Sequence, residues 1–183
     1  DITIRTSLLE MRRIAGSTSV SEQMLSTFKH WAAFQPAGYF VEAKLAERDQ
    51  RHARFGGTRY AVEPNVKDGK GGLRDLHTLF WISKYAYRLD HVRGVLGAGI
   101  LRTSEARAFA SSQRFLWTVR CFLHQHHGRE DDRLTFDAQM QLAPLMGFAD
   151  RSGLRGVERF MKRYYLAARQ VGNLTRIFCA ALA

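Results

Sequence analysis

The stretch from Leu154 to Leu182 constrains the fold more than any other part of this chain. Mostly apolar residues recur in it at steps of three and four: Leu154, Val157, Met161, Tyr164, Ala168, Val171, Thr175, Phe178 and Leu182. This spacing places them on one side of an α-helix. Such a helix must bury that side against other helices, so the stretch predicts one member of an antiparallel bundle. Its regularity indicates core packing rather than a binding site.

Helical patterns also cover most of the remaining chain. Apolar spacing and glycine or proline breaks predict helices over about 19–35, 38–54, 73–87, 92–96, 103–127 and 136–146. Residues 59–72 contain glycines and Pro64, and they predict a short strand with a loop. Residues 2–12 fit either a short strand or a helix. The expected fold is therefore an all-α antiparallel helix bundle with one extended glycine-rich loop. A short strand at the N-terminus is the alternative to a first helix.

Charge and cysteine content narrow the functional classes. The chain has 28 Lys and Arg against 17 Asp and Glu, a net charge of +11. These charges are scattered at helical spacings, which favours solvated helix faces and disfavours nucleic-acid binding. Cys121 and Cys179 lie far apart in apolar patterns, which indicates two buried thiols in a reducing compartment. No apolar run reaches the roughly 20 residues of a membrane span and no signal peptide is evident, so we expect a cytoplasmic protein without membrane contact.

The segment Tyr60–Asp75 is the part that packing alone does not explain. Gly71 and Gly72 directly precede a predicted helix, where backbone N–H groups are free to bind an anion. Lys67, Lys70 and Arg74 add positive charge around the same point. The order of residues is not that of a P-loop.

Two acids of this segment have several possible roles. Glu63 and Asp75 could hold the neighbouring cations in place or ligate a metal. The structural alternative is that the glycines satisfy a tight turn and that Arg74 and Asp75 form surface pairs.

Residues Glu63–Trp81 resemble the signature of the bifunctional PII uridylyltransferase/uridylyl-removing enzymes. They are more distantly similar to a motif of glutamine synthetase adenylyltransferase. Further similar stretches follow the family order at Phe40–Phe55, at Asp131–Asp137 with Gln139, and at Val157–Tyr165. The resemblance therefore covers nearly the whole chain.

The resemblance implies a place within a larger enzyme. In this family a nucleotidyltransferase domain is followed by a helical domain, a hydrolytic HD domain and two glutamine-sensing domains. Residues 1–16 would be the end of the nucleotidyltransferase domain, and residues 17–183 the helical domain. The catalytic aspartate pair and the HD motif are absent from this sequence, so we expect the chain to be inactive alone.

The resemblance also implies substrates, partners and site residues. The full-length enzyme would use UTP and Mg²⁺ to transfer UMP to the PII regulatory protein, with no cofactor held tightly by this chain. Lys67 and Arg74 are the candidates for triphosphate or acidic-partner contacts. The expected substrate-binding set at the domain boundary is Glu63, Asn65, Lys67, Gly71, Gly72, Arg74, Asp75 and Arg133.

Glu10 is the one candidate catalytic residue. The last strand of a nucleotidyltransferase palm typically delivers a third metal-binding carboxylate, and Glu10 occupies a comparable place. The alternative is an exposed glutamate without a catalytic role. His124, His126 and His127 do not predict a metal site, because successive helical residues point about 100° apart. A purely structural scaffold that docks PII or neighbouring domains is the second hypothesis for the whole chain.

Overall fold

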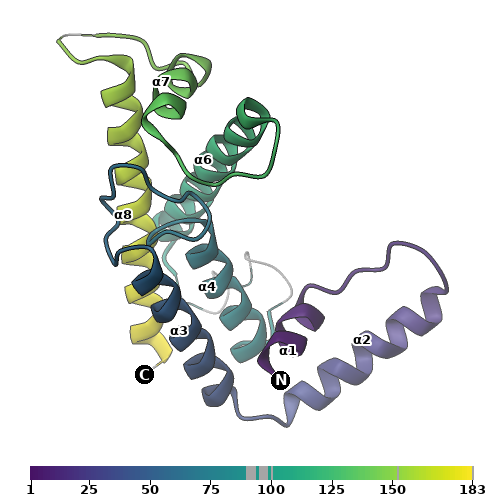
Figure 1. Ribbon diagram of the computed structural model, residues 1–183. Helices are drawn as coiled ribbons and strands as arrows, with labels where there is room; N and C mark the ends of the chain where they lie inside the picture. Colours follow the sequence, from purple (N-terminus) through teal and green to yellow (C-terminus); the bar gives the residue numbers. More distant parts are fainter. Residues whose placement is uncertain (90–93, 95–98, 100, 152, 183) are drawn as a thin grey trace.

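The computed structural model describes residues 1–89, 94, 99, 101–151 and 153–182. Within these residues it contains only helices and connecting loops (Figure 1), with two isolated β-bridges that join Asn65 to Arg133 and Arg151 to Leu154. The prediction of an all-α fold is confirmed. The helices are α1 (Ile2–Leu9), α2 (Thr18–Ala33), α3 (Ala37–Arg54), α4 (Leu73–Ala86), α6 (Thr103–His127), α7 (Phe136–Leu145) and α8 (Gly156–Leu182).

The N-terminal stretch forms a helix, so the strand alternative is wrong. The carboxylate of Asp1 accepts hydrogen bonds from the N–H groups of Thr3, at 2.6 Å, and Ile4, at 3.4 Å. This cap satisfies N–H groups that a short helix would otherwise leave free. The strand expected within residues 59–72 is reduced to the single bridge at Asn65. The short helix expected at 92–96 lies outside the described residues.

Helix α8 is the long element against which α4, α6 and α7 pack (Figure 1). Its predicted apolar side is buried at Met161, Tyr164, Ala168, Val171 and Phe178. The helix begins only at Gly156, so Leu154 precedes it and stays 47% exposed. The interpretation of this stretch as a core-packing helix is otherwise confirmed.

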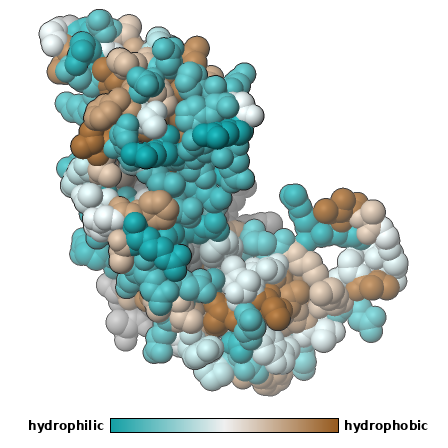
Figure 2. Space-filling view, viewed as in Figure 1, coloured by the Kyte–Doolittle hydropathy of each residue, from teal (hydrophilic) through white to brown (hydrophobic). Residues whose placement is uncertain are grey.

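A second, smaller core joins the first three helices to α4. Phe28, Ala32, Phe40 and Tyr85 are buried together, and the rings of Phe40 and Tyr85 stack with centroids 4.1 Å apart. Only the C-terminal end of α2 takes part, and the rest of this helix extends away from the bundle (Figure 1). Its predicted apolar stripe is therefore only partly buried, and Figure 2 shows hydrophobic surface along this arm.

The cysteines differ from the expectation of two buried thiols. Both are free, but Cys121 is exposed and Cys179 is partly buried. The buried side of α6 carries Leu116, Val119 and Leu123. Cys121 lies two positions from both Val119 and Leu123, which places it on the opposite side of the helix. Among the described residues, no helix combines the length and the apolar character required to span a bilayer.

Candidate functional site

A cleft of about 810 Å³ lies between α1, α3 and α4. Helix α1 and its C-cap residue Glu10 line one side, the second half of α3 lines another, and the start of α4 with Asp68 of the preceding loop closes it. Four of its side chains are cationic and three are carboxylates: Lys44, Arg51, Arg54 and Arg74 against Glu10, Glu47 and Asp68. A large cleft with convergent charged groups is the usual form of a binding site for a charged ligand.

The cationic side of this cleft is built around Trp81. The Lys44 ammonium lies 5.2 Å and the Arg74 guanidinium 5.7 Å from its ring centroid. Lys44 is buried and bonds to Glu47 at 2.7 Å. The Nε of Arg74 lies 3.3 Å from Asp68 Oδ1, and a third of its side chain is exposed. A phosphate could therefore reach this guanidinium, which suits bidentate anion binding.

Glu10 lies on the same cleft as Arg74, 64 positions away along the chain. Lys84 holds it, donating to Glu10 Oε1 at 3.3 Å and to the carbonyl of Leu9 at 2.6 Å. The carboxylate remains about half exposed. The structure thus brings the candidate carboxylate and one candidate phosphate contact to one surface. The described residues contain no group of three or more His, Cys, Asp or Glu side chains able to hold a metal.

The glycine turn before α4 does not present free N–H groups, so that prediction is wrong. The N–H of Gly71 donates to Asp75 Oδ2 at 2.8 Å, and the N–H of Gly72 to the carbonyl of Gly69 at 2.9 Å. The next two N–H groups bond to the carbonyls of Val66 and Lys67. The preceding loop folds back over the helix start and supplies these acceptors, which removes the orphan donors of an ordinary helix end.

The position of Gly71 is set by packing against α8. Its φ is +83°, and an added Cβ would lie 2.6 Å from the carbonyl oxygen of Ala168. A side chain would therefore meet backbone rather than open space. This geometry favours the structural alternative for the glycine pair.

Asp75 is buried at the centre of a charged network that joins α3 to α4. Its carboxylate bonds to Arg51 and accepts from His52 Nε2 at 2.8 Å, besides the N–H of Gly71. Burial raises the pKa of the Asp75 carboxyl, but the hydrogen bonds and charges of these partners outweigh it and lower the pKa below its ordinary value. Asp75 therefore does not form the surface pair with Arg74 that the structural alternative requires, and its side-chain partners Arg51 and His52 belong to α3.

Lys67 lies away from the cleft, toward the end of α6. Its ammonium is 3.1 Å from Glu130 Oε1 and 3.8 Å from Asp132 Oδ2. Asp132 also accepts from Arg120 at 2.7 Å and from His124 at 2.8 Å. The two candidate phosphate contacts, Lys67 and Arg74, are thus on different surfaces.

Glu63, Asn65 and Arg133 hold the loop to the start of α7. Glu63 binds Arg133 at 2.7 Å and accepts from the N–H of Phe136 at 3.0 Å. The Oδ1 of Asn65 accepts from the N–H groups of Lys67 and Asp68, which closes a local turn. Of the eight residues predicted to bind substrate, only Arg74 lines the cleft.

The cleft residues contributed by α3 were not recognised in the sequence. Lys44, Arg51 and Arg54 lie in the predicted helix 38–54, for which the sequence indicates no site residue. Arg51 and Arg54 are three positions apart, which places them on one side of α3. That spacing is the signal that could have found them.

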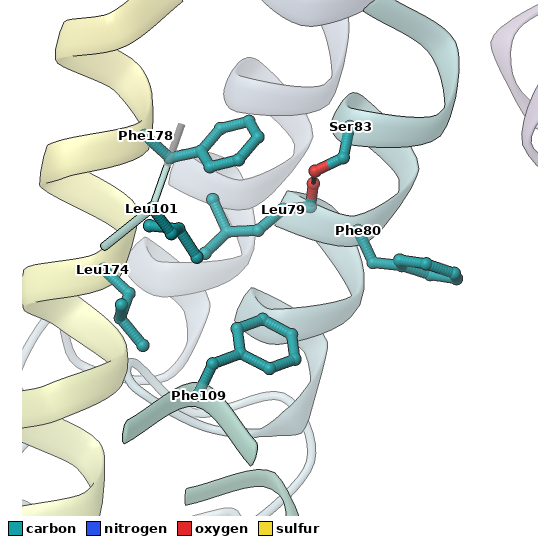
Figure 3. Close-up of a pocket in the computed structure, with 7 residues that line it drawn as sticks. All are labelled: Leu79, Phe80, Ser83, Leu101, Phe109, Leu174 and Phe178. Carbon is teal, nitrogen blue, oxygen red and sulfur yellow. Dashed lines mark hydrogen bonds between the residues drawn. The ribbon is translucent and has the colours of Figure 1, made fainter. Parts of the chain in front are cut away.

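A second, apolar pocket between α4, α6 and α8 is too small to be a ligand-binding site. Figure 3 shows Leu79, Leu101, Phe109, Leu174 and Phe178 around it, and Ser83 donates its hydroxyl to the carbonyl of Leu79. Its volume is about 10 Å³, the space of a single water. It is a packing defect of the core.

Comparisons with known proteins agree with the sequence resemblance. Residues 39–179 match the family model described as GlnD PII-uridylyltransferase. The chain is 52% identical to a bifunctional uridylyltransferase/uridylyl-removing enzyme of Azospirillum brasilense and 52% identical to one of Rhodospirillum rubrum. An enzyme of the same description from Nitrobacter hamburgensis is 50% identical.

Each of these matches covers 100% of this chain, but only 20%, 19% and 20% of the respective relatives. The chain thus spans about a fifth of the length of the curated relatives it matches. No solved structure matches it. The full coverage and the family model together show that the chain belongs to the GlnD PII-uridylyltransferase family.

Proposed function

We propose that this chain is the helical part of an enzyme that transfers UMP from UTP to the PII regulatory protein. In this proposal the α1–α3–α4 cleft faces the nucleotidyltransferase domain of the parent enzyme and completes its substrate site. UTP and Mg²⁺ bind mainly to the other domain, in the cytoplasm. The relatives are named for uridylyl transfer and removal, and the proposal extends the transfer activity to the parent of this chain.

One observation carries the proposal: Glu10 and Arg74 line one cleft although they are far apart in sequence. The resemblance implies a triphosphate or acidic-partner contact for Arg74, and Glu10 occupies a place comparable to that of the third carboxylate of a nucleotidyltransferase palm. A carboxylate and an exposed guanidinium on one surface suit a metal-bound triphosphate, because the carboxylate adds a metal ligand and the guanidinium neutralises phosphate charge.

Replacing Arg74 by Ala in the full-length enzyme should lower kcat/KM for UTP by about tenfold or more, because one charge-assisted hydrogen bond to phosphate is lost. Thermal stability should change little, since the Arg74–Asp68 pair is partly exposed. Steady-state UMP transfer and thermal unfolding measure the two effects.

Arg155→Ala is the matched control. Arg155 is also an exposed arginine paired with an acid, Glu158, at 3.6 Å, but it lies outside the cleft. Replacing Arg155 by Ala should leave kcat/KM for UTP within twofold of that of the unmodified enzyme. Equal losses of activity for both variants, or a loss for Arg74→Ala that parallels lost stability, would favour the scaffold alternative. The proposal also requires the isolated chain to be inactive, so UMP transfer to PII by this chain alone would overturn it.

A further inference from the structure

A second charged pocket, of about 300 Å³, lies along residues 55–70, the loop between α3 and α4, and Arg133 also lines it. Arg59, Lys70, Arg133 and Glu63 line it, and we call these four residues the basic pocket. None of them lines the α1–α3–α4 cleft. The basic pocket is therefore separate from the cleft on which the proposed uridylyl transfer rests.

Arg59 is the least compensated charge in this pocket. Its Nε is completely enclosed and has no hydrogen-bond partner among the described residues. The guanidinium lies directly on the backbone of α8 at Gly172, where an added Cβ would be 2.5 Å from Nη2 and 2.6 Å from Cζ. A glycine in the middle of a helix costs stability, and here it makes room for a cation. Burial of an unpaired donor is itself unfavourable, so the free protein carries an electrostatic deficit at this point.

The neighbouring charges do not remove this deficit. Lys70 donates to the carbonyl of Gly57 at 2.9 Å and has no carboxylate partner in the part of the chain that the structure describes. Glu63 is the one acid lining the pocket, and its two oxygens are used by Arg133 and by the N–H of Phe136. Three cations thus face one carboxylate, and the excess is two positive charges. A partly enclosed pocket with this excess attracts a dianion.

We propose that the basic pocket binds the phosphate group of a small ligand. Guanidinium groups match phosphate oxygens in geometry and are weakly hydrated, and two of them, those of Arg59 and Arg133, belong to residues that line the pocket. The volume lies at the lower limit of ligand pockets, which suits inorganic phosphate or a small phosphomonoester.

Isothermal titration calorimetry of the full 183-residue chain with inorganic phosphate tests this site. We expect one saturable site, and a rise in Tm of the chain when phosphate is added. Arg59→Met and Lys70→Met should each weaken phosphate binding by tenfold or more. Arg155→Met is the matched control, because Arg155 is an exposed arginine that lines neither the cleft nor the basic pocket, and it should leave the affinity within twofold.

The two pocket variants separate binding from folding. Arg59 packs on α8, so its replacement could alter the fold, whereas the Lys70 ammonium is exposed and its removal should leave the circular dichroism spectrum and the phosphate-free Tm unchanged. Glycerol 3-phosphate, titrated in parallel, distinguishes the source of the phosphate: tighter binding than inorganic phosphate indicates an ester ligand. Absence of saturable binding to the unmodified chain, or equal weakening by Lys70→Met and Arg155→Met, would overturn the proposal. Neither result bears on uridylyl transfer.

Discussion

Replacing Asp75 by Ala should lower the free energy of unfolding by about 3 to 5 kcal/mol, the usual cost of removing one partner from a buried ion pair. Asp75 is 2% exposed and binds Arg51, His52 and the N–H of Gly71 at once. Its loss would leave the largely buried Arg51 without its counter-ion and the N–H of Gly71 without an acceptor. Urea denaturation at neutral pH measures the change.

Asp68→Ala provides the control for this prediction. Asp68 lies in the loop before α4 and also pairs with an arginine, but it is partly exposed and its closest contact with Arg74 is 3.3 Å. Its removal should cost less than about 1 kcal/mol. Equal losses of unfolding free energy for Asp75→Ala and Asp68→Ala would show that the burial of Asp75 does not strengthen its interactions with Arg51 and His52.

The same network predicts how stability depends on pH. The pKa of Asp75 is lower in the folded chain than its ordinary value, so the unfolded chain binds the proton more readily. The stabilisation is therefore complete above the ordinary pKa of about 4 and is lost as the pH falls through the lowered folded pKa. The stability difference between the unmodified chain and Asp75→Asn should accordingly narrow below about pH 4. A difference that stays constant down to pH 2 would contradict the assigned direction of the shift.

The helical elements could be predicted because their signals are local. The apolar side of α8 follows directly from periodicity, and residues such as Ala168 and Val171 are buried as expected. The first stretch could not be decided, since its helix depends on a cap from Asp1 that competes with β-branched residues favouring a strand. The exposure of Cys121 follows from which side of α6 meets α8, and that depends on the partner helix.

The candidate site was predictable only in part because its geometry comes from distant segments. Gly71 and Gly72 were read as anion-binding, but the acceptors that satisfy their N–H groups come from the fold of the preceding loop and from Asp75. The partners of Asp75 lie more than 20 positions earlier, on α3. The cleft itself forms only because α1, α3 and α4 contact one another, and no local sequence pattern predicts those contacts.

Replacing Gly71 by Ala should destabilise the chain by about 2 to 5 kcal/mol, because two costs act at one position. The positive φ of +83° is unfavourable for a residue with a side chain by about 1 to 2 kcal/mol. The new Cβ would also lie 2.6 Å from the carbonyl oxygen and 2.9 Å from the Cα of Ala168, so the loop or α8 must move, at a cost of about 1 to 3 kcal/mol. Thermal or urea unfolding measures the sum.

Gly56→Ala isolates the first of these costs. Gly56 has a nearly equal φ of +80°, but nothing lies within 4 Å of its added Cβ, so it should cost only about 1 to 2 kcal/mol. The excess for Gly71→Ala measures the contact between the glycine loop and α8. Alanine keeps the backbone N–H, so Gly71→Ala removes no hydrogen-bond donor. A loss of stability far larger than that of Gly56→Ala therefore reports lost packing. Equal losses at both positions would mean that backbone conformation alone requires Gly71, and that the approach to Ala168 can relax without cost.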